Sequence, residues 1–273
     1  MNLEGLMLST ASLAFAVTLT AFDAHGQALR DCGGRSEAPA EVARVIDGRS
    51  FLLADGREVR LAAIETPLAV PGDEDEARVQ AALAAKTALE TLLLDREVHL
   101  FALSSGLDRY GRLVAYAFIR TSSGEALVQH ELLAAGHALV SPAASAATCR
   151  IYLRNAERDA RNGGLGLWGD PYYAVKAAAD PADVLVEQGR FALVQGKVMS
   201  VRESGGIVYV NFGQRWSEQF TVTILKRNER IFAGAGLTPK ALAGRSIEVR
   251  GWVEERGGPA IEVSRPEQIE VIH

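Results

Sequence analysis

The chain has 273 residues, of which 48% are hydrophobic, and carries a net charge of −5 at neutral pH. This composition excludes an intrinsically disordered protein, and the length favours two domains. Residues 29–185 hold 17 basic and 22 acidic side chains, whereas residues 186–273 hold 12 and 10, so the first region is the poorer at attracting a polyanion.

Residues 5–22 carry no charged side chain, and small residues follow at Ala24, Gly26 and Ala28. An apolar stretch followed by alternating small residues is typical of a secretory signal peptide. We therefore predict that residues 1–28 are a signal peptide cleaved near Gly26 or Ala28, and that the mature protein is exported, periplasmic or secreted, with no membrane attachment. Because no Lys or Arg precedes the apolar stretch, a start at Met7 and an uncleaved anchor are alternatives.

The chain contains two cysteines, Cys32 and Cys149. An even number of cysteines in an oxidising compartment favours a disulfide, which would tie the new N-terminus to the rest of the chain. Two unpaired cysteines acting as small apolar residues are the alternative. No spacing of Cys and His indicates a zinc site, and the five histidines are scattered.

Residues 45–67 read VIDGRSFLLADGREVRLAAIETP. Apolar runs flank Asp55 and Gly56, the dipeptide that most readily reverses a strand, so the stretch predicts a β-hairpin. We expect it to deliver Arg60 and Glu65 to one end of a barrel. Their sequence spacing alone does not bring them together, because residues five apart on a strand face opposite sides.

An amphipathic helix is predicted over residues 76–94, where apolar positions recur every three to four residues. Four acids, Asp73 to Glu76, stand at its start and are expected to cap it; a catalytic part for one of them is the alternative. Further elements of this region are strands at 98–103 and 113–119, a helix at 125–135 and a last helix at 148–161.

A linker or docking arm is predicted at residues 171–187, where two prolines and an Ala run interrupt any clear periodicity. Beyond it the pattern is of strands, at 191–201, 207–212, 220–225, 246–253 and 259–263, with a short helix at 238–244. Three strands, a helix and two strands is the order expected of an oligonucleotide-binding-type barrel, here residues 188–273.

One surface of this second barrel has the residue types of a single-strand binding platform. Aromatic side chains can stack on bases beside cations that hold phosphates. The residues concerned are Lys226, Arg227, Arg230, Tyr209, Phe212, Trp216 and Phe220. The alternative is that the aromatic residues fill the barrel core.

Three motifs share the order and approximate spacing of one known family: VIDG at 45–48, RLAAIETP at 60–67 and DRYGR at 108–112. With them the chain resembles the staphylococcal nuclease-like (thermonuclease) family over a domain spanning residues 38–170. The resemblance implies a mainly β fold with packed helices, a five-stranded oligonucleotide-binding-type barrel, followed here by the second small β-barrel. In active members it also implies calcium-dependent hydrolysis of phosphodiesters.

The same resemblance implies that Arg60 and Arg112 are the guanidiniums that hold phosphate, and that Glu65 is a metal carboxylate. The chain departs from the family at two positions: Arg49 replaces a second metal-binding acid, and Leu68 replaces the general base. We therefore expect no bound calcium or other cofactor, an Arg49–Glu65 ion pair, and nuclease activity that is weak or lost. Binding of single-stranded nucleic acid or phosphate is the predicted function, and a non-catalytic envelope scaffold is the alternative.

Overall fold

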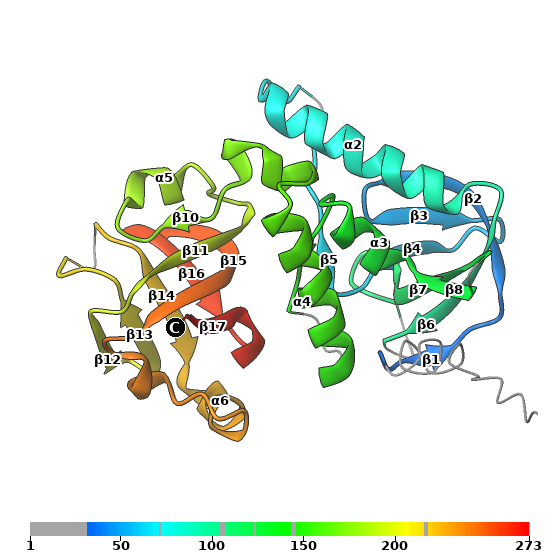
Figure 1. The fold of residues 1–273 in the computed structure, drawn as a ribbon. Coiled ribbons are helices and arrows are strands. Elements are labelled where there is room, and N and C mark those ends of the chain that lie inside the picture. The colour runs from blue at the N-terminus through cyan, green and yellow to red at the C-terminus, as the bar shows by residue number, and fades with distance from the viewer. Residues whose placement is uncertain are drawn as a thin grey trace, which may run out of the picture.

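The computed structural model describes residues 32–70, 72–103, 107–122, 124–142, 146–215 and 218–272, so the predicted signal peptide lies outside the described residues. Two β domains lie side by side with helix α4 (Ala147–Asn162) between them (Figure 1). In the described part of the chain, no helix has the length and hydropathy needed to cross a membrane.

The first domain is a closed five-stranded barrel, in which β2 pairs with β3, β3 with β4, β4 with β7, β7 with β6 and β6 with β2. The hairpin predicted within residues 45–67 is confirmed by β3 and β4, and the strands predicted at 98–103 and 113–119 are confirmed by β6 and β7. Pairing is antiparallel except between β4 and β7. The strands are β2 (Ala40–Asp47), β3 (Ser50–Leu53), β4 (Glu58–Leu61), β6 (Glu97–Ala102) and β7 (Leu113–Thr121), with β1 (Arg35–Ser36) beside β6.

Helix α2 (Glu76–Leu93) packs on this barrel through Ala85, Leu89 and Leu93, as the periodicity predicted. Its N-cap is Asp75, whose carboxylate accepts a hydrogen bond from Arg78 N, so capping by this acidic stretch is confirmed.

The helix predicted at residues 125–135 is wrong in its first part. Residues Gly124–Leu127 form β8, which pairs antiparallel with β7, and α3 begins only at Val128 and runs to Ala134. The unpaired edge of β7 offers hydrogen bonds to the segment that a helix would leave unmade.

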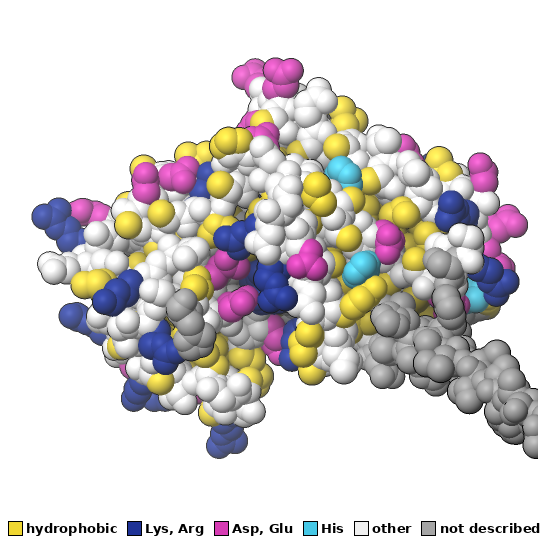
Figure 2. All heavy atoms as spheres, viewed as in Figure 1, with side chains coloured by type: hydrophobic (Ala, Val, Ile, Leu, Met, Phe, Trp, Pro, Cys, Tyr) yellow, Lys and Arg dark blue, Asp and Glu magenta, His cyan; other side chains and the backbone are white. Residues whose placement is uncertain are grey.

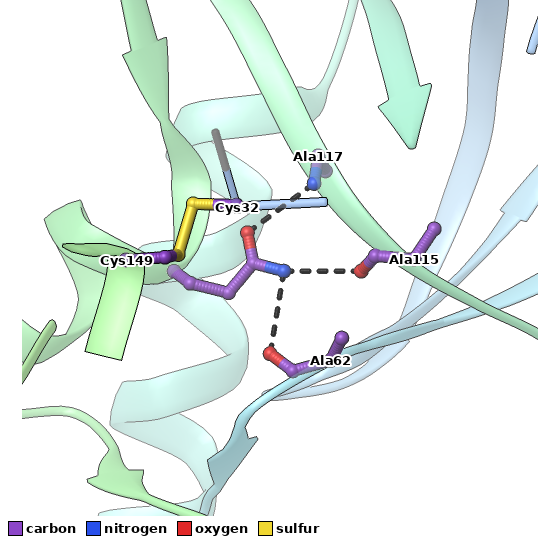
Figure 3. Close-up of a disulfide and its surroundings, with 6 residues drawn as sticks. Cys32, Ala62, Ala115, Ala117 and Cys149 are labelled. Carbon is purple, nitrogen blue, oxygen red and sulfur yellow. Dashed lines mark hydrogen bonds between the residues drawn. A yellow bond between two sulfur atoms is a disulfide. The ribbon is translucent and has the colours of Figure 1, made fainter. Parts of the chain in front are cut away.

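The predicted disulfide is present between Cys32 and Cys149, both of which are buried (Figure 3). Next to it the side chain of Gln129, on α3, donates to Ala115 O and Ala62 O and accepts from Ala117 N. The disulfide therefore fixes the segment at Cys32 and α4 beside the strands that lead to the Glu65 corner.

Replacing Cys32 and Cys149 by alanine is expected to lower the free energy of unfolding by about 5 kcal/mol in the chain-entropy account, because the two cysteines lie 117 positions apart. Urea unfolding of the two proteins measures the difference. Mass spectrometry of the purified protein that found both thiols free would contradict the pairing.

The second domain has the same strand order as the first. Its sheet runs β11, β15, β16, β14, β13, β12, with β14 and β16 parallel, and Val198 and Met199 join β11 directly to β12. The elements are β11 (Phe191–Lys197), β12 (Ser200–Ser204), β13 (Ile207–Asn211), β14 (Thr221–Leu225), α6 (Glu229–Gly234), η4 (Pro239–Leu242), β15 (Ser246–Arg256), β16 (Gly258–Val263) and β17 (Ile269–Ile272). The predicted order of three strands, helix and two strands is observed when β11 and β12 are counted as one strand interrupted at Val198 and Met199, with α6 and β17 added.

Of the two alternatives for residues 171–187, a linker or a docking arm, the structure shows a segment that packs on the second domain. Within it, β10 (Lys176–Ala177) pairs parallel with β11, and α5 (Pro181–Leu185) buries Val184 in the second core. The prolines that looked like linker residues begin short helices, where a missing N–H costs nothing.

The aromatic residues of the predicted platform separate in the structure. Phe212 and Phe220 pack together in the core with ring centroids 5.0 Å apart, whereas Tyr209 is half-buried and Trp216 lies outside the described residues. Arg227 and Arg230 are exposed, and Lys226 forms an ion pair with Glu203. Lys and Arg side chains are spread over the visible face of this domain instead of forming one patch (Figure 2).

A buried ion network joins the two domains. The Arg250 guanidinium, on β15, donates to Glu157 Oε2 on α4 at 2.8 Å and to Val140 O at 3.1 Å. Arg161 on α4 reaches Glu248 at 2.8 Å, and Arg250 also contacts Glu248 at 3.2 Å. Burial alone would lower the pKa of Arg250, but Glu157 and Glu248 more than offset it, so its pKa lies above the ordinary value.

Candidate functional site

A bent corner after β4 brings Arg60 and Glu65 together. Ala63 has φ of 61°, the left-handed region that non-glycine residues seldom adopt, and the chain then enters β5 (Ile64–Glu65). β5 pairs with β9 (Leu139–Val140), which holds Glu65 opposite Leu139. Arg60 Nη2 consequently lies 2.5 Å from Glu65 Oε1, although the two residues have opposite parity along the strand.

The turn between β2 and β3 brings Arg49 to the same carboxylate. Arg49 Nη1 pairs with Glu65 Oε2, so the predicted Arg49–Glu65 ion pair is observed. The turn is held by a bond from Arg49 N to Asp47 Oδ1 of 2.9 Å. Gly48 permits the close packing, because a Cβ there would lie 2.7 Å from Ala85 Cβ and 3.0 Å from Thr66 Oγ1.

The Glu65 carboxylate is therefore held between two guanidiniums and is almost completely buried. Burial, followed by repulsion from Arg60, lowers the pKa of Arg49 to about 10, although Asp47 acts in the opposite direction. Burial and Arg112 likewise lower the pKa of Arg60. Arg49 remains a cation at neutral pH, so the carboxylate has a permanent positive partner.

Arg112 lies in the loop between β6 and β7. Its Nε and Nη2 donate to Asp108 Oδ2 at 3.0 and 2.9 Å, while Asp108 Oδ1 accepts from the backbone N of Tyr110 and Arg112. Burial would raise the pKa of Asp108, but the bonds from Arg112 and Tyr110 hold it below its ordinary value. Since Arg112 lowers the pKa of both Arg49 and Arg60, the three guanidiniums act on one another at this end of the barrel.

Leu68, which stands at the position of the expected base, lies on the wall of a cavity of about 350 Å³ between the domains. Glu65 and Thr66 line the same cavity. Asp73, one of the acids considered as a substitute base, is also on the wall, but its Oδ1 accepts from Arg78 and from Asp75 N.

The residues present do not fit a calcium ion. Calcium takes six to eight oxygen ligands from carboxylates, carbonyls and water. Here both oxygens of Glu65 bind guanidiniums, and the described part of the chain contains no cluster of three or more His, Cys, Asp or Glu that could hold a metal. The Arg49 guanidinium, a cation that belongs to the chain itself, already pairs with the Glu65 carboxylate.

The family resemblance implied that Arg49, Arg60, Glu65 and Arg112 belong to one site. It gave no indication of which residues of the second domain face that site. Tyr172, Arg190 and Trp252 line the cavity beside Glu65, and Tyr172 Oη donates to Asp75 Oδ2 at 2.6 Å. The tyrosine pair at 172–173, in a stretch otherwise rich in Ala and Pro, is the one local signal that this segment packs against something.

Among curated proteins, none matches this chain. Residues 58–170, from the start of β4 to the end of the first domain, match the family described as staphylococcal nuclease homologue. These are the residues that carry Arg60, Glu65, Leu68 and Arg112. With its barrel, its bent corner and this match, the first domain belongs to the staphylococcal nuclease family.

Proposed function

We propose that the protein is an exported nuclease-family protein that binds single-stranded nucleic acid or phosphate through Arg60 and Arg112, with weak or lost hydrolysis. The observation that carries the proposal is the Arg49 guanidinium on the Glu65 carboxylate. Two further guanidiniums lie at the same end of the barrel, and planar bidentate donors suit phosphate oxygens.

The expected loss of activity follows from the groups replaced. A general base usually contributes about 10² to 10⁴ in rate, and Leu68 has no group that accepts a proton. Arg49 removes a negative ligand and adds a positive charge in its place. Phosphodiester cleavage also needs positive charge around the phosphorus, which Arg60 and Arg112 could still supply.

Binding of a fluorescent single-stranded DNA oligonucleotide, measured by anisotropy, is expected to weaken as salt rises, because each phosphate held by an arginine releases counterions. Replacing both Arg60 and Arg112 by Gln should lower the affinity by about tenfold and reduce the salt slope by about two. Arg44→Gln, an exposed arginine on β2, is the control and should leave the slope within about one of the parent value.

The second candidate is a non-catalytic scaffold of the cell envelope that retains only the fold. It is favoured by the fact that both Arg60 and Arg112 already have carboxylate partners, Glu65 and Asp108. A scaffold would show no salt-dependent binding of DNA, so the anisotropy measurement separates the two functions. Nuclease assay of the mature protein with and without calcium then decides how much hydrolysis remains.

Export is supported by the disulfide, which is typical of oxidising compartments. N-terminal sequencing of the secreted protein is expected to begin near residue 27 or 29. Recovery of the intact leader in the membrane fraction would favour the uncleaved anchor.

A further inference from the structure

The outer face of the second sheet is polar where β12, β13 and β14 lie side by side. Every second residue of β13 and β14 belongs to the apolar core, so the residues between them face outward. Strand pairing sets the outward residues in two rows across the three strands. One row is Arg202, Tyr209 and Thr223, and the other is Ser200, Asn211 and Thr221.

Two hollows lie on this face. The larger has a volume of about 480 Å³ and runs along β12 and β13, which is within the range for ligand sites. The smaller, of about 140 Å³, lies between β13, β14 and the start of β16. Tyr209 lines both, so its side chain stands between them. The described residues that line the two hollows belong to the second domain, which separates this face from the Glu65 site.

The polar side chains of the larger hollow can be reached from solvent. Arg202, Ser204 and Gln214 are exposed, and Ser200 is half-buried. Ser200 Oγ accepts from Asn211 Nδ2 at 3.4 Å, at the long limit for a hydrogen bond, and keeps its own hydrogen available to donate. Hydroxyl and amide groups both donate and accept, so they suit a ligand that does the same at many points.

The charge of the larger hollow limits what can bind there. Among the described residues that line it, Arg202 is the one charged side chain, and its guanidinium has no carboxylate partner in the described part of the chain. In the smaller hollow, Arg256 is already paired with Glu254 and Glu262. One free guanidinium matches an isolated carboxylate, whereas a nucleic-acid strand gains its affinity from several cations that neutralise successive phosphates.

Tyr209 and Met199 give the larger hollow an apolar part. Tyr209 is half-buried, and Met199 is 54% exposed. An aromatic side chain offers a flat apolar face together with a polar tip. A sugar ring is complementary to it, because its C–H face packs on the aromatic ring while its hydroxyl groups reach polar neighbours.

We propose that this outer face of the second barrel binds an acidic oligosaccharide. Arg202 pairs with the carboxylate of one sugar, Tyr209 packs against a sugar ring, and the polar side chains of β12 bind hydroxyl groups. The proposal goes beyond the proposed function, because it shares no residue with the DNA site at Arg60 and Arg112.

The test measures binding of two tetrasaccharides to the purified full-length protein by isothermal titration calorimetry at fixed salt. Hyaluronan tetrasaccharide alternates glucuronic acid with N-acetylglucosamine, whereas chitotetraose contains N-acetylglucosamine and no carboxylate. The hyaluronan probe is expected to bind about tenfold more tightly, because a hydrogen bond between charged groups adds to the affinity. Arg202→Gln should remove this preference and leave the affinity for chitotetraose unchanged.

Tyr209→Ala should lower the affinity for both tetrasaccharides by about tenfold, because both lose the same ring contact. Arg202 is exposed, so Arg202→Gln keeps the proposal falsifiable if Tyr209→Ala fails to fold. Arg230→Gln is the matched control, since it makes the same chemical change at an exposed position of α6 that does not line the larger hollow. It should leave both affinities unchanged.

Absence of binding by both tetrasaccharides, equal binding of the two, or an unchanged preference in Arg202→Gln would each overturn the proposal. A thymidine hexamer or a tetraglutamate peptide at equal concentration is expected to leave the hyaluronan probe bound. Displacement by either competitor would assign the face to nucleic acid or to an acidic peptide instead. Replacing both Arg60 and Arg112 by Gln should leave hyaluronan affinity unchanged, so failure of DNA binding and failure of this proposal are distinguishable.

Discussion

The double substitution of Arg49→Asp and Leu68→Glu is expected to give calcium-dependent cleavage of DNA that neither single variant shows in full. Arg49→Asp removes the cation from Glu65 and places a second carboxylate beside it, and Leu68→Glu supplies a proton acceptor on the adjoining wall. The added base should raise the calcium-dependent rate by about 10² to 10⁴ over Arg49→Asp alone. Cleavage of a fluorogenic oligonucleotide, with calcium or with a chelator, measures the gain.

Thermal unfolding gives a second, independent measurement of the same change. Calcium should raise the melting temperature of the double variant and leave that of the parent unchanged, because only a ligand that binds the folded state stabilises it. Arg44→Asp makes the same charge change on β2 at an exposed position and should gain neither property. Strong calcium-dependent cleavage by the parent would contradict the interpretation of Arg49 and point to one of the acids at residues 73–76 as the base.

Glu157→Gln is expected to lower the free energy of unfolding by about 3 kcal/mol, because it leaves the Arg250 guanidinium buried without its main counter-charge. Both side chains are almost fully buried, and Glu248, at 3.2 Å, remains as the second partner of Arg250. Glu157 Oε1 also accepts from Val140 N at 2.6 Å, so the substitution perturbs β9. Urea unfolding followed by tryptophan fluorescence and by circular dichroism measures the loss.

The matched control is Glu218→Gln, which breaks an exposed pair with Arg215 and should change stability by no more than about 1 kcal/mol. A loss below this level in Glu157→Gln would show that the interdomain network contributes little. The network also bears on the site, because β9 pairs with β5 and so with Glu65. Weaker DNA binding by Glu157→Gln at temperatures where it stays folded is therefore expected.

The amino-acid sequence by itself predicted the β-hairpin and the helix at residues 76–93 from local signals, namely apolar runs around an Asp-Gly turn, helical periodicity and acids at a helix start. The disulfide was expected from the even number of cysteines and the predicted export. The closed first barrel and the pairing of Arg49 with Glu65 were expected from the family resemblance that the three motifs carry. The sequence also predicted the order of strands in the second domain. The prediction was wrong where a neighbouring strand overrode local preference, as when residues 125–127 joined the edge of β7, and it left open whether residues 171–187 were a linker or a docking arm, which the pairing of β10 with β11 decided.

Tertiary structure alone decided how the two barrels meet and what that contact creates. The bond from Arg250 to Glu157 joins residues 93 positions apart, and the cavity wall combines residues from 65 to 252. Periodicity in the sequence cannot predict such contacts. They depend on how the surfaces of the two folded domains pack together, and not on the secondary-structure propensity of any one segment. The same is true of the corner at Ala63, where the positive φ that unites Arg60 with Glu65 is imposed on a residue with no preference for it.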